Sequence, residues 1–376
     1  MPRPLRALVV LTSPPLSEGN AQGRCAVALL RGLRAHGVDV SAVAARRAHS
    51  ITGELPDDLD VEIVPVSPPP RSLRRQLDRV RRPRGELRGD FAARVRELAP
   101  DADVVHLDET EAAWCDESID VPSVVHMHYL VRLDQDLGAP WTSSFRHVAE
   151  FALAERAAAR RHRYLVASSP LVADGLRALS PRAEITLAPL SLDPRYYDPA
   201  PLDGPPVAGI IGAGFWPPTQ TAIRRLTRIW PRVIERVPAA RLRIAGRRMS
   251  EIVGQPGRGV ELVGEVASAA EFFNGLSLLL YPVSRGSGMK VKVLEALAAG
   301  VPVVTTRFGA EGIDPGAGVT VADDDDALVA AAVALLEDAE RRRAAGSAAR
   351  ELFLRRYAPE PATEPLVRLY ERMTRT

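Results

Sequence analysis

The sequence predicts an α/β protein of two domains, each a parallel sheet with helices on both faces. A chain of 376 residues exceeds what one ordinary hydrophobic core holds. An apolar run at 278–281, a glycine loop, a helix-forming stretch at 289–299 and a second apolar run at 301–305 form one strand–helix–strand unit. Such a unit implies parallel strands joined by a right-handed crossover. The same order occurs at 5–43, and the proline-rich segment 198–206 separates the two halves.

Composition narrows the class of protein. A hydrophobic fraction of 46%, a charged fraction of 26% and a net charge of +2 are typical of a globular protein and give no reason to expect nucleic acid binding. Lysine is nearly absent, whereas arginine is abundant. Cys25 and Cys115 have no metal-binding or redox spacing. The apolar run 7–11 is too short for a signal peptide, and no stretch approaches the ~20 apolar residues of a membrane helix, so we expect a cytoplasmic protein.

The first half alternates buried strands and helices. We expect strands at 5–11, 38–43, 103–107, 121–126, 164–167 and 185–189, and helices at 24–35 and 144–161. A further short helix begins at Pro170, after the capping pair Ser168 and Ser169. These elements make up the first predicted domain, 1–200.

The second predicted domain spans 206–357. Before the central unit we expect strands at 207–211, 241–245 and 260–263 and a helix at 269–275; after it, helices at 326–336 and 341–356. Three prolines (359, 361 and 365) break the chain before a last helix at 366–373.

The loop after the strand at 278–281 has the properties of an anion site. Gly286 and Gly288 allow a ligand to approach the backbone closely, and the next helix presents free N–H groups at its start. Arg285 and Lys290, the latter expected in the first helical turn, add positive charge where a helix dipole disfavours it. A bound anion would make this arrangement favourable. The alternative is that the loop is only a turn.

Glu295 is a polar residue on the apolar part of the same predicted helix. Its carboxylate can accept hydrogen bonds from two neighbouring hydroxyls, as on a ribose. A basic loop for a diphosphate and a carboxylate for a ribose together describe a nucleotide-sugar site. The alternative is that Glu295 pairs with Lys292, one turn earlier.

The segment GSGMKVKVLEALAAGVPVVTT at 286–306, followed by GAEGI at 309–313, resembles the nucleotide-sugar motif of retaining GT-B glycosyltransferases of family 4, in the branch with G-x-G-x-K-x-K. The commoner motif has two glutamates separated by seven residues, and here Ser287 stands at the first position. The resemblance implies that Lys290 and Arg285 take over around the phosphates. It also implies sugar transfer from a nucleoside-diphosphate sugar to a hydroxyl acceptor, with retention of configuration and without a metal.

A second donor loop is expected after the strand at 207–211. GAGFWPPTQTAI resembles the G-x-F-x-W-x-P-N loop of the same branch, with Gly214 and Phe215 as candidate donor contacts. Pro217 occupies the third glycine position of a dinucleotide fingerprint, which argues against a nicotinamide cofactor. The loop lacks the arginine and lysine with which many relatives hold the diphosphate.

Further candidates come from other strand ends. Arg247 ends the strand at 241–245 and can reach phosphate, although a plain surface arginine is the alternative. The resemblance implies that backbone groups of Gly264 and Val266 lie near the base. In the loop after the first strand, the family's pair of glycines that meets the transferred sugar and diphosphate is not intact. Gly19 is the nearest match, and a plain loop glycine is the favoured alternative.

Histidines stand at the ends of two strands of the first domain. VVHMHY resembles the family strand whose histidine lies beside the transferred sugar, so His126 is the first candidate for that position. His128 ranks second and His106 third.

Residues 71–96 are rich in arginine. Such a helical stretch can contact an anionic membrane surface or acceptor weakly, while the alternative, a solvated surface segment, is favoured.

We therefore predict a GT-B glycosyltransferase of the hexosyltransferase type, with the last helix, about 358–376, crossing back to the first domain. No paired aspartates lie at a strand end, so no metal and no cofactor beyond the donor substrate are expected. The alternatives are a nucleotide-sugar epimerase of the same architecture and a catalytically silent partner subunit.

Overall fold

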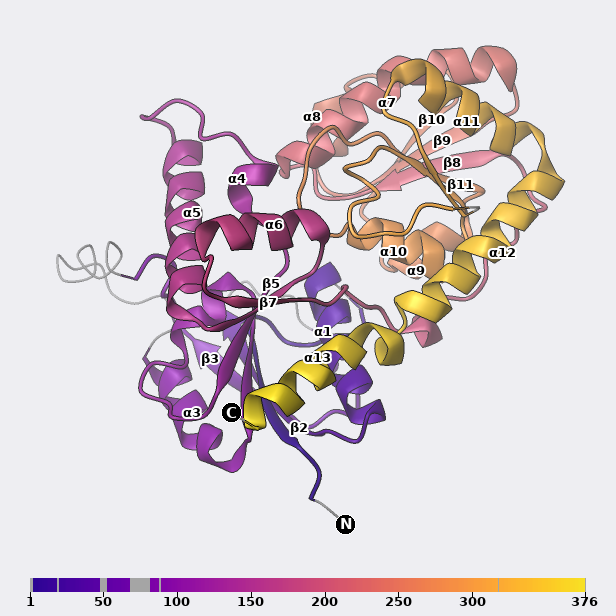
Figure 1. Ribbon diagram of the computed structural model, residues 1–376. Coiled ribbons are helices and arrows are strands. Elements are labelled where there is room, and N and C mark those ends of the chain that lie inside the picture. Colours follow the sequence, from indigo (N-terminus) through magenta and orange to yellow (C-terminus); the bar gives the residue numbers. More distant parts are fainter. Residues whose placement is uncertain are drawn as a thin grey trace. The chain divides into compact units, whose positions relative to one another are not determined.

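The chain forms two compact units, each with its own parallel sheet (Figure 1). The computed structural model describes residues 3–18, 20–47, 53–67, 82–87, 89–316 and 318–375. The first unit comprises Met1–Ser191 together with Pro359–Thr376, and the second comprises Leu192–Ala358. The predicted class, two parallel-sheet α/β halves, is confirmed.

The sheet of the first unit has the strand order β3-β2-β1-β4-β5-β6-β7, and every pairing is parallel. Its strands are β1 (Arg6–Leu11), β2 (Asp39–Arg47), β3 (Val61–Val66), β4 (Val104–Asp108), β5 (Ser123–Met127), β6 (Tyr164–Ala167) and β7 (Glu184–Leu187). The order reverses between β1 and β4, so their carboxyl ends flank the place where such sheets bind ligands.

Helices cover both faces of this sheet. On one face α3 (Asp90–Leu98), η2 (Thr110–Trp114), α5 (Ser143–Arg161) and α6 (Pro170–Leu179) share a core with the strands. The short elements η1 (Ala99–Asp101) and α4 (Val131–Asp134) connect them. On the other face α1 (Ala21–Ala35) packs against α13 (Pro359–Thr374), from the far end of the chain.

The last helix corrects a prediction. It spans Pro359–Thr374, which agrees with the predicted 358–376 and is longer than the predicted 366–373, and Pro365 lies inside it. A proline in the first turn costs no hydrogen bond, and the loss at Pro365 is offset because α13 buries Leu366, Leu369 and Tyr370. The helices approach so closely that a Cβ on Gly32 would lie 2.3 Å from the carbonyl oxygen of Pro359.

The sheet of the second unit has the order β10-β9-β8-β11-β12-β13, again all parallel. Its strands are β8 (Val207–Ile211), β9 (Arg241–Ala245), β10 (Val260–Gly264), β11 (Leu278–Tyr281), β12 (Val303–Thr305) and β13 (Val319–Val321). The order reverses between β8 and β11.

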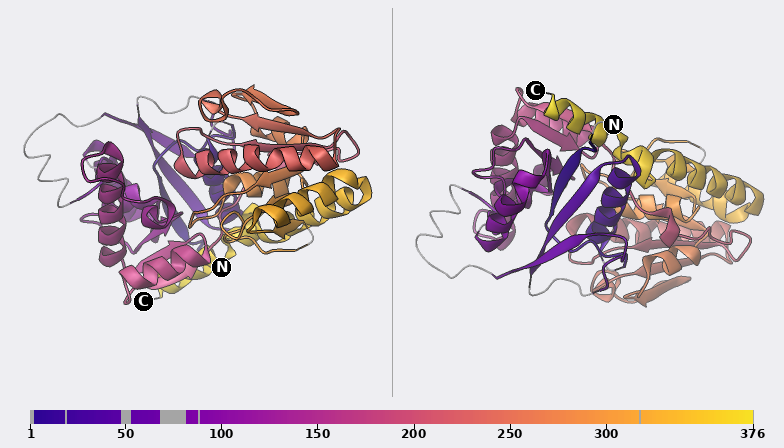
Figure 2. Two further views of the ribbon diagram at one scale, coloured as in Figure 1. Left: turned by 90° about the horizontal axis from the view of Figure 1, so that it is seen from above. Right: turned by 90° about the horizontal axis from the view of Figure 1, so that it is seen from below.

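Helices also cover both faces of the second sheet. One face carries α7 (Pro217–Arg236), α8 (Met249–Val253) and α11 (Asp325–Glu337), and α7 contacts both of the others (Figure 2). The other carries α9 (Ala269–Asn274), α10 (Val291–Ala298) and α12 (Ala339–Arg356). The short η3 (Pro194–Tyr196) precedes β8. The domain thus places α10 directly after the glycine loop.

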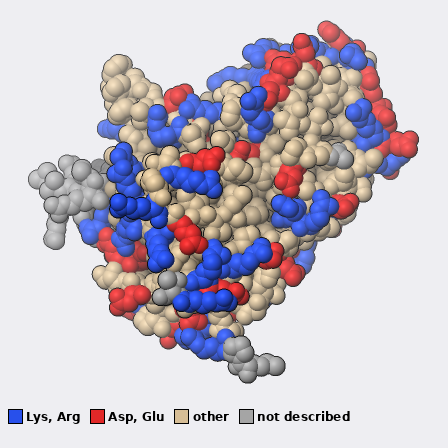
Figure 3. All heavy atoms as spheres, viewed as in Figure 1, with Lys and Arg blue, Asp and Glu red and all other residues tan. Residues whose placement is uncertain are grey.

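Acidic and basic side chains are interspersed over the face seen in Figure 3. Within the described ranges, no helix is long and apolar enough to cross a membrane. Of the arginine-rich segment 71–96, residues 71–81 and 88 lie outside the described residues, so its proposed membrane contact stays a prediction.

Candidate functional site

Loops at the carboxyl ends of β8, β9, β10 and β11 lie at one edge of the second sheet, because all these strands run parallel. Three of them meet through their backbones. Gly214 N donates to Arg247 O at 3.0 Å, and Gly246 N donates to Gly264 O at 2.6 Å. A Cβ on Gly246 would lie 1.8 Å from Gly212 O, so this packing excludes any side chain there.

The side chains of these loops differ in exposure. Phe215 is 60% exposed, and Arg247 forms an exposed 2.8 Å ion pair with Glu265. Gly264 has φ of +78°, in the left-handed region, and Val266 is partly buried. The loops therefore offer backbone groups, an aromatic ring and a paired arginine rather than a free cluster of cations.

The loop after β11 is buried although it has no regular structure. Gly286 has φ of +145°, and a Cβ there would lie 2.8 Å from Nζ of Lys290. Lys290 Nζ donates to the carbonyl oxygen of Gly288, and Ser287 is fully buried. Arg285 is partly buried at the start of the loop. These predicted residues therefore lie together.

The position of Lys290 relative to the helix differs from the prediction, which placed it in the first helical turn. It is the N-cap of α10, with extended backbone, and the helix begins only at Val291. β-Branched Val291 takes the first helical position, and no side chain caps the helix. The ammonium group still lies next to the free N–H groups of the first turn.

Glu295 lies within α10 and is only 3% exposed. Its Oε1 accepts a hydrogen bond of 3.2 Å from the hydroxyl of Tyr197, which belongs to the same unit. Tyr197 therefore holds the carboxylate in a defined orientation, a contact that no local sequence pattern indicates.

Lys292 is the residue here that the sequence analysis treated only as a structural partner. Its Nζ lies 4.6 Å from the centroid of the Tyr281 ring and 3.0 Å from where a Cβ on Gly212 would lie. It makes no ion pair or hydrogen bond with a described residue. Burial, and secondarily Lys290, lower the pKa of Lys292 to about 8, although Glu295 acts in the opposite direction.

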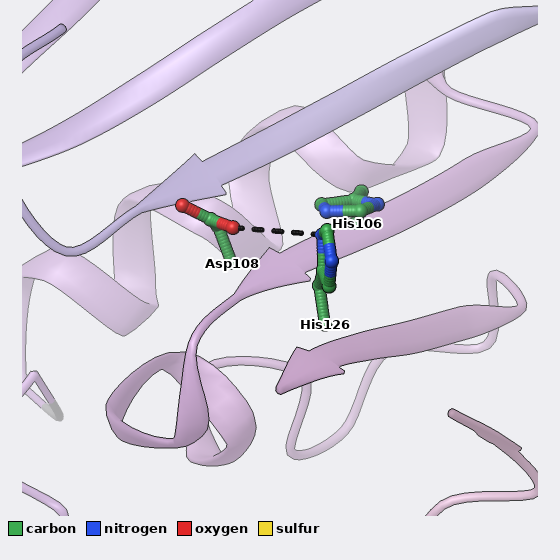
Figure 4. Close-up of side chains that lie close together, drawn as sticks. All are labelled: His106, Asp108 and His126. Carbon is green, nitrogen blue, oxygen red and sulfur yellow. Dashed lines mark ion pairs between the residues drawn. The ribbon is translucent and has the colours of Figure 1, made fainter. Parts of the chain in front are cut away.

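In the first unit, the predicted histidines form a buried cluster around Asp108 at the carboxyl ends of β4 and β5. The register pairs Asp108 with His126, and Figure 4 shows their side chains facing each other, with His106 beside them. Asp108 Oδ1 lies 2.9 Å from His128 Nε2 and 3.9 Å from His126 Nδ1. The hydroxyl of Tyr370, on α13, is 2.6 Å from His106 Nδ1. All three predicted histidines are thus brought together.

The three histidines of this cluster differ in protonation. Burial opposes protonation of His128, but Asp108 and Glu109 outweigh it and raise its pKa to about 10. Burial also opposes ionisation of Asp108, yet His128 brings its pKa down to about 2. Burial lowers the pKa of His106 to about 4 and the pKa of His126 well below its usual value. His128 is therefore the cation, and the other two histidines are neutral.

A hydrogen-bonded set of polar residues adjoins the histidine cluster, where the strand order reverses between β1 and β4. Glu109 Oε2 accepts hydrogen bonds from Thr12 Oγ1 at 2.8 Å and from Gln22 Nε2 at 2.5 Å, and Glu109 Oε1 is 3.5 Å from His128 Nδ1. Glu109 has φ of +73°, which is unusual for a non-glycine residue. Glu109 was not predicted from the sequence, although it and Asp108 directly follow the buried strand residues around His106. Gly19, the other candidate here, lies outside the described residues.

The cluster also resembles a metal-binding set. One ligand atom each from His106, Asp108 and His126 lies within 4.8 Å of the others. Tetrahedral zinc with bonds of about 2.0 Å needs ligand atoms about 3.3 Å apart. Because Asp108 is already paired with a cationic His128, the arrangement fits a charge network better than a metal centre.

Comparison with protein families gives two matches that together span most of the chain. Residues 20–191 match a family model described as "Glycosyl transferase 4-like domain", and residues 205–338 match one described as "Glycosyl transferases group 1". Both matches are to glycosyltransferase domains, and the group 1 model matches residues 205–338 alone. The comparison with curated proteins gave no match.

Solved structures similar to this glycosyltransferase share its fold over nearly the whole chain. A sucrose-phosphate synthase from Thermosynechococcus elongatus has a TM-score of 0.74 at 16% identity, covering 98% of this chain and 99% of its own. HepE from Anabaena, in complex with UDP-glucose, has a TM-score of 0.67 at 14% identity, covering 97% and 99%. TarM from S. aureus, in a complex that includes UDP, has a TM-score of 0.69 at 9% identity, covering 97% and 100%. At these identities the likeness shows the fold, which is GT-B.

Proposed function

We propose that this glycosyltransferase moves a hexosyl group from a nucleoside-diphosphate sugar to a hydroxyl acceptor, with retention of configuration and without a metal. The observation that carries the proposal is the edge of the second sheet. There, a buried glycine loop runs from Arg285 to Lys290, the N-cap of α10, and the same helix holds the buried carboxylate of Glu295.

The parts of this edge fit the parts of a nucleoside-diphosphate sugar. A diphosphate carries negative charge, which Lys290, Arg285 and the N–H groups of α10 attract. Glu295, held by Tyr197, is an acceptor for two ribose hydroxyls. The bare backbone of Gly264, where an added Cβ would meet nothing within 4 Å, leaves room for a flat base. The HepE and TarM complexes named above contain UDP, which supports a uridine donor as the first to test.

In the proposed reaction the bond between the anomeric carbon and the diphosphate oxygen breaks. The acceptor oxygen bonds to that carbon on the same face, and its proton passes to the departing diphosphate. Negative charge therefore grows on the leaving group, and preorganised cations at that position lower the barrier. Lys290 and Arg285 stabilise the charge in this scheme, while neutral His126 in the first unit is the proposed contact of the transferred sugar.

The test is incubation of the purified protein with UDP-, GDP- and dTDP-hexoses, each with and without a panel of hydroxyl acceptors. We expect one donor to yield free nucleoside diphosphate, faster when an acceptor is present, and proton NMR of the product to show the donor's anomeric configuration. An inverted product would exclude retention. Conversion of the donor into another nucleotide sugar without any acceptor would identify an epimerase instead.

A further inference from the structure

The whole chain contains two lysines among its 49 basic residues, and they are Lys290 and Lys292. Every other cationic side chain of this kind is an arginine. The two groups are not equivalent, because an ammonium is a compact point charge whereas a guanidinium is a broad, planar fork. The lysines thus stand where the surroundings select a small cation.

The surroundings of Lys292 show why an arginine does not fit. Its Nζ lies next to Gly212, the first residue after β8, where a single added Cβ would be only 3.0 Å away. Thr219, in the first turn of α7, lies as close to that Cβ position, and the ring of Tyr281 is 4.6 Å from Nζ. The amine therefore fills a narrow space at the reversal between β8 and β11.

The cation is unfavourable there without a ligand. The amine forms no ion pair or hydrogen bond with a described residue. Burial makes its protonation harder, Glu295 on the same helix favours protonation, and Lys290 opposes it. Lys292 is partly buried, and a lysine there that only stabilised the fold would be expected to have a partner. An anion bound beside it would supply the missing charge.

The position of Lys292 also bears on the cation that the loop after β8 lacks. The loop after β8, residues 212–216, contains neither arginine nor lysine. Lys292 brings its ammonium to the start of that loop from a different element, α10.

We propose that Lys292 binds the donor diphosphate from the β8 side of the site and replaces the cation that the loop after β8 lacks. This inference rests on the proposed function, since it assigns a second cation to the same diphosphate. Lys290 and Lys292 then contact the anion from two sides, and Gly212 is required as glycine to leave room for the ammonium.

Because there are only two lysines, they can be observed directly. Protein produced with lysine labelled with ¹³C at Cε gives two side-chain signals, and a Lys290→Arg variant assigns them. UDP, GDP and dTDP are added separately, and calorimetry under the same conditions measures whether each binds. We expect the bound diphosphate to shift the Lys292 signal and to raise the pH at which that signal titrates.

Variants test whether the contact contributes to affinity. Lys292→Met keeps an unbranched side chain, one atom shorter, and removes its charge, and we expect nucleoside-diphosphate binding to weaken by about 10- to 100-fold. The apo variant should unfold at the same temperature as the wild type or higher, because a poorly solvated charge is gone.

The outcomes separate this inference from the proposed function. Binding of a nucleoside diphosphate with an unmoved Lys292 signal, or with unchanged affinity in Lys292→Met, would overturn the inference and leave the proposed function standing. Lower thermal stability of the apo variant with unchanged affinity would make Lys292 structural. If none of the three nucleoside diphosphates binds the wild type, the proposed function itself fails, and the inference fails with it.

Discussion

The pairing of His128 with Asp108 makes the first unit sensitive to pH. Protonated His128 is stabilised in the folded chain, where its pKa is raised from 6.5 to about 10. Its contribution to the unfolding free energy is therefore complete below about pH 6.5 and is lost as the pH rises towards 10.

The contribution of the pair to the unfolding free energy can be estimated from the pKa shifts of both His128 and Asp108. At about 1.4 kcal/mol per pKa unit, the shift of His128 corresponds to roughly 5 kcal/mol and that of Asp108, from 3.8 to about 2, to roughly 2.5 kcal/mol. The value from His128 is larger because Glu109 also attracts this cation. The pair with Asp108 alone is better represented by the smaller figure, so we expect His128→Gln to destabilise the first unit by about 2–5 kcal/mol at pH 6.5.

The assay is amide hydrogen exchange of peptides that contain β4 and β5, because it reports on the first unit separately from the second. Wild type and His128→Gln are compared at each pH between 6 and 10, so that the intrinsic exchange rate cancels. Exposed His147 provides the matched control, and His147→Gln should leave these peptides unchanged. A difference between wild type and His128→Gln that stays constant over this range would refute the assignment of the charge to His128.

Four other predictions concern the donor site and the packing of α13. Glu295→Ala should weaken donor binding by about 1.5–3 kcal/mol, measured by calorimetry, and equal affinity in a folded variant would remove Glu295 from the site. Lys290→Ala should lower kcat/KM by about 100-fold or more with nearly unchanged apo thermal stability, because charge grows on the diphosphate in the transition state; normal turnover would make the lysine structural. Turnover should persist in excess EDTA, and a loss reversed by magnesium or manganese would show that a metal neutralises the diphosphate. Gly32→Ala should destabilise the contact of α1 with α13 by about 1–3 kcal/mol, because its Cβ would lie 2.3 Å from the Pro359 carbonyl oxygen. Hydrogen exchange in α13 should then be faster. Gly257→Ala, with open space around the added Cβ, is the control.

Elements buried on both sides were predictable from the sequence alone. The strands β6, β8 and β11 have the predicted bounds, because each is a short apolar run between turn or cap residues. β9 also has the predicted bounds, although two arginines alternate with its apolar residues. β3 was not assigned, because it is an edge strand that is only partly buried and alternates weakly. The last helix was shortened in the prediction because prolines were taken as breaks, whereas packing against α1 outweighs the one lost hydrogen bond.

The candidate site was predictable where it is local. Arg285, Gly286, Gly288 and Lys290 lie within one loop, so their sequence spacing already implied that they meet. The charge of His128 was not predictable, since it depends on the register of β4 and β5 and on Glu109. The position of Lys292 beside Gly212 likewise requires the strand order, which sets β8 next to β11.

The placement of α13 also bears on the order in which the protein forms during synthesis. The ribosome makes the strands and α1 of the first unit early, but it makes α13 only after the entire second unit, Leu192–Ala358. Until then the nascent first unit lacks the surface that covers α1 and the hydroxyl of Tyr370 that bonds His106. Apolar surface exposed for that time favours association with chaperones or with other chains. A circular permutant that begins at Pro359 and continues through a linker into the present N-terminus would make the first unit contiguous. It should therefore fold with less aggregation when translation is slow.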